Sequence, residues 1–175
     1  MLFRETILPG VFEIEPELKA DDRGFFARTW CSQEFQRNNL SARLAQCSIS
    51  HNRRKGTLRG MHLQREPHAE AKLVRCTAGA IYDVAVDLRP GSPWFKKWVG
   101  VTLSAVNRRM LFIPEGCAHG FLTLADDTEV FYQISEFYHP ESGTGVRWND
   151  PSFGIEWPAA VEVIADRDRN YPDFQ

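Results

Sequence analysis

The sequence has no long hydrophobic run. Nowhere do its apolar residues extend without interruption over the roughly 18 residues that a transmembrane helix needs. It also lacks an excess of one charge, since 21 Lys and Arg residues face 23 Asp and Glu residues, a net charge of −2. This balance argues against a nucleic-acid or membrane-surface partner recruited by bulk charge. The first residues carry no basic segment followed by an apolar one, so we expect no signal peptide and a cytoplasmic protein.

Cysteines are few and widely spaced. The four cysteines are Cys31, Cys47, Cys76 and Cys117. None of them form a Cys-x-x-Cys pair of the kind that zinc sites and thioredoxin-type proteins use. We therefore expect free thiols, as is usual in a reducing compartment. The 43% of hydrophobic residues are ordinary for a soluble globular protein, and the length suits one domain over residues 1–175.

Short strand-like runs separated by turns dominate the pattern. Over residues 80–88, apolar side chains alternate with Asp83 and Asp87, which fall on the opposite face. Further runs of this type cover residues 72–77, 98–104, 110–113, 120–124 and 129–135. We expect the last two runs to pair around the turn between them. One short helix is predicted over residues 33–37, with Ser32 as its N-cap. Twelve Gly and ten Pro residues supply many turns, so the sequence predicts an all-β sandwich or barrel.

Two histidines raise the question of a metal site. His119 ends a Pro-x-Gly-x-x-His run that resembles the second half-motif of the cupins, which are small jelly-roll barrels. Metal-binding cupins pair it with a His-x-His motif, but here His62 is followed by Gln64, a poor ligand for transition metals. Glu66 and Glu70 do not restore the pattern. We therefore expect no catalytic metal, and a core histidine is the structural alternative.

Strand alternation places Leu58, Gly60 and Gln64 on the same face as His62. By the same rule Tyr132 projects among apolar groups. It is either an ordinary buried tyrosine or a proton donor.

Several basic residues lie beside strand-like apolar residues instead of in a charged run. They are Arg23, Arg59, Lys72 and Arg75. Together with the histidines, such residues favour the binding of an anionic ligand such as a diphosphate.

Eight segments in order along residues 8–168 resemble those of the dTDP-4-dehydrorhamnose 3,5-epimerase family. They are DRGFF at 22–26, LRGMHLQ at 58–64, KLVR at 72–75, YDVAVDLR at 82–89, WVGV at 98–101, IPEGCAHGF at 113–121, EVFY at 129–132 and RWNDP at 147–151. The resemblance implies an all-β, cupin-type jelly roll (a double-stranded β-helix) with a few short helices. It also implies a homodimer without metal or cofactor. The implied substrate is a nucleotide-linked 4-keto-6-deoxyhexose, inverted at C3, C5 or both in rhamnose-type biosynthesis.

The resemblance also assigns roles to residues. His62 matches the family's base, Tyr132 its acid, Lys72 the group beside the 4-keto oxygen, and Asp168 the carboxylate that orients the base. The candidate substrate contacts are Arg23, Arg28, Gln46, Ser48, Arg59, His119, Tyr138 and Arg167. The chemistry is self-consistent, because epimerisation beside a ketone needs a base on one face and an acid on the other, without a redox cofactor.

Two departures concern the nucleotide. Arg28 stands where the family commonly has a Glu that reads thymine. The family also often uses a Gln-x-Asn pair, and here Ser48 takes the place of its Asn. The nucleotide therefore stays open among dTDP, CDP and GDP. The alternatives to an epimerase are a nucleotide-sugar ketoisomerase, a non-catalytic sugar-binding cupin and a metal-dependent dioxygenase.

Overall fold

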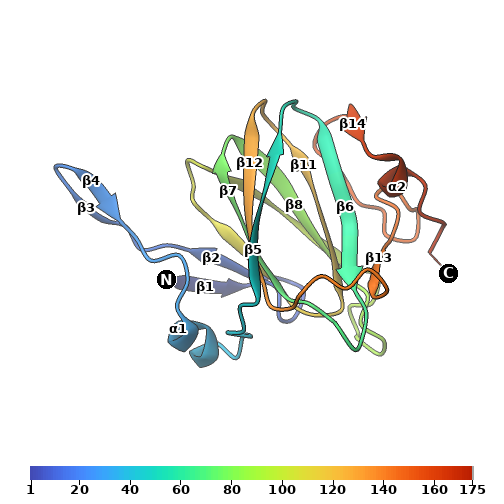
Figure 1. Cartoon of the computed structure of the whole chain (residues 1–175), viewed down its shortest axis with the longest axis horizontal. Coiled ribbons are helices and arrows are strands. Elements are labelled where there is room, and N and C mark those ends of the chain that lie inside the picture. Colours follow the sequence, from blue (N-terminus) through green and yellow to red (C-terminus); the bar gives the residue numbers. More distant parts are fainter. Residues whose placement is uncertain (175) are drawn as a thin grey trace.

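The computed structural model describes residues 1–174, which form two facing sheets with a separate hairpin beside them (Figure 1). In the first sheet the strand order is β1 (Leu2–Glu5), β2 (Phe12–Glu15), β10 (Met110–Ile113), β7 (Lys72–Ala78), β12 (Thr128–Ile134) and β5 (Gln46–Asn52). In the second it is β13 (Gly143–Gly145), β6 (Thr57–Gln64), β11 (Cys117–Thr123), β8 (Ala80–Asp87) and β9 (Trp98–Ser104). The remaining strands are β14 (Val163–Ile164), parallel to β6, and the hairpin strands β3 (Lys19–Asp21) and β4 (Gly24–Phe26). The all-β, cupin-type prediction is confirmed.

Successive strands cross repeatedly between the sheets, which is the jelly-roll pattern. This crossing makes the expected pairing of residues 120–124 with 129–135 wrong. Strand β11 pairs with β6 and β8, whereas β12 pairs with β5 and β7. The turn between β11 and β12 carries the chain from one sheet to the other, so each strand finds two partners in its own sheet.

The main core lies between the two sheets. Alternation along β8 sends Ile81 and Ala85 into this core, while Val84 and Val86 pack outward under the C-terminal segment around Phe153. The alternation predicted for this strand is therefore confirmed. Full burial of each large apolar side chain stabilises the fold by about 1.5–3 kcal/mol.

Two short helices are present within residues 1–174, and neither is long and apolar enough to span a membrane. The first, α1 (Ser32–Arg37), covers the outer face of the first sheet with Phe35, whose ring meets Phe112 edge-on at 5.8 Å. The prediction of Ser32 as N-cap is wrong by one residue. Cys31 is the extended N-cap residue, and its carbonyl accepts the first helical bond from Phe35. The second helix, α2 (Asp166–Arg169), lies near the C-terminus beside β6.

Candidate active site

A cavity of about 460 Å³ opens between the two sheets. Ten of the twelve predicted site residues line it: Gln46, Ser48, Arg59, His62, Lys72, His119, Tyr132, Tyr138, Arg167 and Asp168. Arg59, His62 and His119 come from the second sheet, while Lys72 and Tyr132 come from the first. The cavity is therefore lined by polar groups from two facing walls.

A bulge at Gly60 brings Arg59 and His62 onto the same wall. His62 pairs with His119, and Arg59 pairs with Phe121. Between these two pairs β6 therefore has one more residue than β11, which is a β-bulge. Gly60 has φ +132°, and a Cβ there would lie 2.4 Å from the Cα of Gly120, so only glycine fits.

The bulge also corrects the simple alternation predicted for residues 58–64. Leu58 does not line the cavity, whereas Arg59 does. An extra residue in one strand reverses which side chains face inward, so strict alternation fails beyond it.

His62 and Asp168 form a hydrogen-bonded dyad. His62 Nε2 lies 2.7 Å from Asp168 Oδ1, and the Gly60 amide donates to the other carboxylate oxygen at 3.1 Å. Burial of Asp168, whose side chain is 6% exposed, opposes its ionisation. The hydrogen bonds from His62 and Gly60 outweigh this and hold the pKa of Asp168 below its ordinary value. An ionised carboxylate only accepts, so Nε2 donates to Asp168, and Nδ1 is the ring nitrogen left to act as a base.

Tyr132 faces the dyad's wall from the other sheet. Burial raises the pKa of its phenol well above the ordinary value, the Asp83 carboxylate raises it further, and Arg59 partly opposes the shift. The phenol is therefore protonated at neutral pH and can act as a proton donor. Its ring contacts His119 edge-on at 6.0 Å, and His119 Nε2 lies 2.7 Å from the buried Asp83.

Lys72 supplies a cation inside the cavity wall. Its Nζ lies 2.7 Å from Glu70 and donates to the His62 carbonyl at 3.3 Å. Lys72 is buried, and both side chains of the pair are only slightly exposed. Lys72 neighbours Tyr132 in the same sheet, because β7 pairs with β12. The pairing with Glu70 keeps this cation within the site.

The side chain of Gln64 is hydrogen-bonded to backbone groups. Its amide nitrogen donates to the carbonyls of His68 and Phe137, both at 3.0 Å, and its oxygen accepts from the His139 amide at 2.6 Å. The residue that replaces a cupin metal ligand therefore links two loops. Its amide nitrogen and oxygen are therefore already occupied by hydrogen bonds to the backbone.

The rim of the cavity carries polar groups suited to an extended ligand. Gln46 and Ser48 on β5 pair with Ile134 and Tyr132 on β12. Arg167 donates to the Tyr171 hydroxyl at 3.0 Å. These groups could hydrogen-bond a sugar or a nucleotide.

Arg23 and Arg28 do not reach the cavity of their own chain. Arg23 lies at the turn of the β3–β4 hairpin, which projects away from the sheets (Figure 1). Its side chain is 90% exposed and pairs with Asp21. Arg28 pairs with Glu34. The prediction that both contact substrate beside the other residues is not met within one chain.

Arg75, suggested as part of an anion site, also lies elsewhere. Its guanidinium carbon lies over the Phe131 ring, 4.9 Å from the ring centroid, and Arg75 does not line the cavity. The reason is alternation, since Val74 on the same strand faces the core between the sheets.

Three residues near the site escaped the sequence-based assignment of roles. Asp83 holds His119, Glu70 holds Lys72, and Asn52 accepts from Arg59 Nε at 2.8 Å. Asp83 had a visible signal, a charged residue in an otherwise apolar alternating strand. Asn52 had none, because its contact depends on how β5 and β6 meet.

Comparisons with known proteins agree with this geometry. The family model described as dTDP-4-dehydrorhamnose 3,5-epimerase matches residues 5–175. A dTDP-4-dehydrorhamnose 3,5-epimerase of Methanothermobacter thermautotrophicus is 48% identical over 172 residues, covering 97% of this chain and 92% of that protein.

Solved structures also match over nearly the whole chain. The epimerase from Elizabethkingia anophelis matches with a TM-score of 0.96 at 37% identity, covering 99% of this chain and 96% of that one. The Bacillus anthracis epimerase, solved with TDP and PPi bound, matches with a TM-score of 0.95 at 40% identity, covering 99% of both chains. The chain belongs to the dTDP-4-dehydrorhamnose 3,5-epimerase family.

Proposed function

We propose that the protein is a cofactor-independent epimerase that inverts C3, C5 or both of a nucleotide-linked 4-keto-6-deoxyhexose in rhamnose-type biosynthesis. One observation carries the proposal. A carboxylate-held imidazole, His62, and a phenol kept protonated, Tyr132, line one cavity from opposite sheets. A base and an acid on opposing walls are what inversion at a carbon beside a ketone requires.

The proposed reaction begins with proton abstraction. His62 Nδ1 takes the proton from the carbon beside the ketone, and the electron pair of the C–H bond forms an enolate. Lys72 stabilises the negative enolate oxygen, a type of contact that is typically worth about 3–4 kcal/mol in the transition state. Tyr132 then returns a proton to the opposite face of the carbon. Exchange with solvent restores the phenol and the neutral imidazole.

The proposed chemistry uses no metal. Its charges are handled by Lys72 and the His62–Asp168 dyad, and the metal-ligand position of other cupins holds the fully bonded Gln64. Dialysis against a strong chelator is expected to leave turnover unchanged. Loss of activity that one divalent metal restores would contradict this part of the proposal.

We propose thymidine diphosphate as the nucleotide. The support is the membership of the family and the TDP bound in the Bacillus anthracis relative. Arg28 and Ser48 keep CDP and GDP as alternatives. Competition by dTDP, CDP, GDP and UDP separates them, and inhibition by CDP or GDP that exceeds inhibition by dTDP would overturn the choice.

We further propose a homodimer in which the β3–β4 hairpin reaches the partner. The hairpin exposes Phe26 at 73% and Arg23 at 90%, an arrangement that favours contact with another chain. The partner's cavity would then receive Arg23 for the diphosphate. Light scattering should give a molecular mass twice that of one chain. Arg23→Ala should raise KM, while Lys19→Ala on the same hairpin should not. A single chain mass at micromolar concentration would contradict the dimer.

We also propose a cytoplasmic location. The exposed Cys47 is a free thiol, which suits a reducing compartment. Fractionation of the producing cells tests it, and recovery outside the cytoplasm would refute it.

The decisive experiment for the function is turnover in D₂O with a panel of 4-keto-6-deoxy sugars linked to dTDP, CDP and GDP. NMR should locate deuterium and inversion at C3 and C5. A product with its carbonyl moved to another carbon would indicate a ketoisomerase. Binding without exchange would indicate a sugar-binding cupin.

A further inference from the structure

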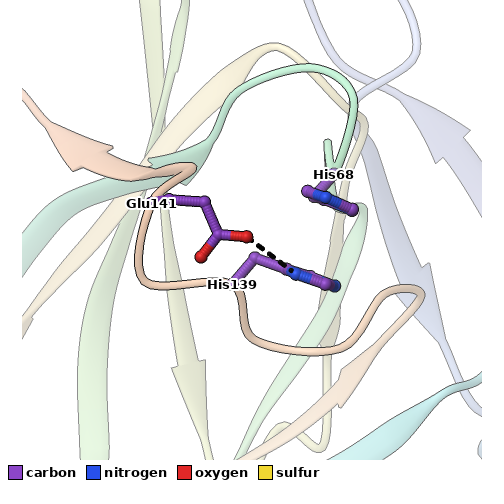
Figure 2. A group of neighbouring side chains, drawn as sticks. All are labelled: His68, His139 and Glu141. Carbon is purple, nitrogen blue, oxygen red and sulfur yellow. Dashed lines mark hydrogen bonds and ion pairs between the residues drawn. The ribbon is translucent and has the colours of Figure 1, made fainter.

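Two loops beside the cavity bring together three potential metal ligands that the proposed reaction does not use. His68 lies in the loop after β6, and His139 and Glu141 lie in the loop after β12 (Figure 2). One ligand atom from each residue lies within 4.8 Å of the other two. The three side chains therefore form a compact cluster, although His68 is distant in the sequence from the other two.

One pair of ligand atoms in the cluster already has the spacing found in a coordination shell. His139 Nδ1 lies 3.2 Å from Glu141 Oε1. In a tetrahedral zinc site with bonds of about 2.0–2.1 Å, neighbouring ligand atoms are about 3.3 Å apart. The rings of His68 and His139 stack at 3.5 Å with planes 7° apart. A modest rotation of the rings would turn one nitrogen of each toward a shared ion.

The backbone that carries the cluster is held in place. The buried Gln64 side chain bonds the His68 carbonyl, the His139 amide and the Phe137 carbonyl, so it fixes both loops to each other. The His139 carbonyl also accepts from the Ser142 amide at 3.0 Å. Such support reduces the ordering cost of binding an ion.

The surrounding charges favour a cation. Glu141 is 67% exposed and free to adjust. Glu136 lies near both imidazoles, and its charge is partly compensated by Arg43 at 2.8 Å.

We propose that His68, His139 and Glu141 bind one zinc-like divalent cation, with water completing its shell. Two imidazole nitrogens and one carboxylate oxygen suit Zn²⁺, whereas Mg²⁺ and Ca²⁺ prefer oxygen ligands. The ion clamps the two loops that Gln64 links, beside the cavity-lining Tyr138. It takes no part in proton transfer, so this inference does not rest on the proposed function.

Calorimetric titration of the full chain, free of any purification tag, with ZnCl₂ tests the site. We expect one Zn²⁺ per chain, no comparable binding of Mg²⁺, and a melting temperature that rises with Zn²⁺ concentration. His68→Ala and His139→Ala should each weaken binding roughly ten-fold or more. Glu141→Gln should weaken it too, and its exposed position makes loss of folding no explanation.

Two control variants guard against other surface ligands. His51→Ala removes a histidine that lies near a different carboxylate, Asp127, and should bind Zn²⁺ as wild type does. Cys47→Ser removes the exposed thiol and should also leave binding unchanged. With Co²⁺, the absorption should lack thiolate charge-transfer bands. Absence of Zn²⁺ binding, binding that survives His139→Ala, or binding lost in Cys47→Ser would overturn the proposal.

Discussion

Replacing Asp168 with asparagine tests whether the carboxylate sets the state of His62. Asparagine has nearly the same shape, so the cavity should be preserved. Its amide cannot satisfy both partners as the carboxylate does. If the amide oxygen keeps the bond from the Gly60 amide, the NH₂ group faces His62 Nε2 and forces that nitrogen to accept. The ring proton then moves to Nδ1, which can no longer take a proton from the substrate.

The magnitude follows from the loss of the base. The variant gives up a 2.7 Å charge-assisted bond between His62 and a nearly buried carboxylate, and it holds the wrong tautomer. Losing a general base typically costs about 10²–10⁴-fold in rate, which corresponds to about 3–5 kcal/mol. We expect this loss in kcat, with KM little changed, because asparagine preserves the shape of the cavity wall.

Steady-state kinetics and solvent exchange of the substrate proton measure the effect. Asp166→Asn on the same helix is the matched control, because Asp166 is exposed and lies outside the cavity. Both variants should melt cooperatively. Near wild-type kcat for Asp168→Asn, or an equal loss in Asp166→Asn, would refute the dyad.

Three further predictions concern charge and reactivity. Lys72→Met should lower kcat by roughly 10²–10³-fold by removing the cation beside the enolate; kinetics that stay at the wild-type level would exclude that role. Asp87→Asn should lower the free energy of unfolding by about 2–3 kcal/mol at pH 7, as measured by urea denaturation. Burial opposes ionisation of Asp87, but the hydrogen bonds and charge of Arg89 lower its pKa. This stabilisation is present above the ordinary Asp pKa of about 3.9 and is lost as pH falls through the lowered pKa of Asp87. The free energy of unfolding of the variant should not show this part of the pH dependence. Iodoacetamide at pH 8 should label the exposed Cys47 but not Cys117, because burial raises the pKa of Cys117 to about 12; labelling of both in the folded protein would contradict this.

Local patterns in the sequence predicted the elements well. The runs at 98–104 and 110–113 coincide with β9 and β10, because alternation and flanking turns act over a few residues. Which strands pair was not accessible in this way. The turn between β11 and β12 looks like a hairpin in sequence, but only packing of the whole sandwich sends the two strands to different sheets.

The site shows the same division. The motifs placed His62, Lys72 and Tyr132 in one cavity. The bulge at Gly60 was not predicted, since a glycine in a strand does not by itself reveal an extra residue. Arg23 lies away from the cavity because the strands of its hairpin pair with each other and join neither main sheet, so nothing local in the sequence fixes where the hairpin lies.

In the proposed reaction His62 removes the proton and Tyr132 returns it from the opposite wall. Incubation of Tyr132→Phe with substrate in D₂O tests it most directly. We expect deuterium uptake beside the ketone without inversion, because His62 can return a proton to the face it deprotonated. In His62→Ala we expect no uptake at all. Inversion by Tyr132→Phe at the wild-type rate, or deuterium uptake by His62→Ala, would contradict it.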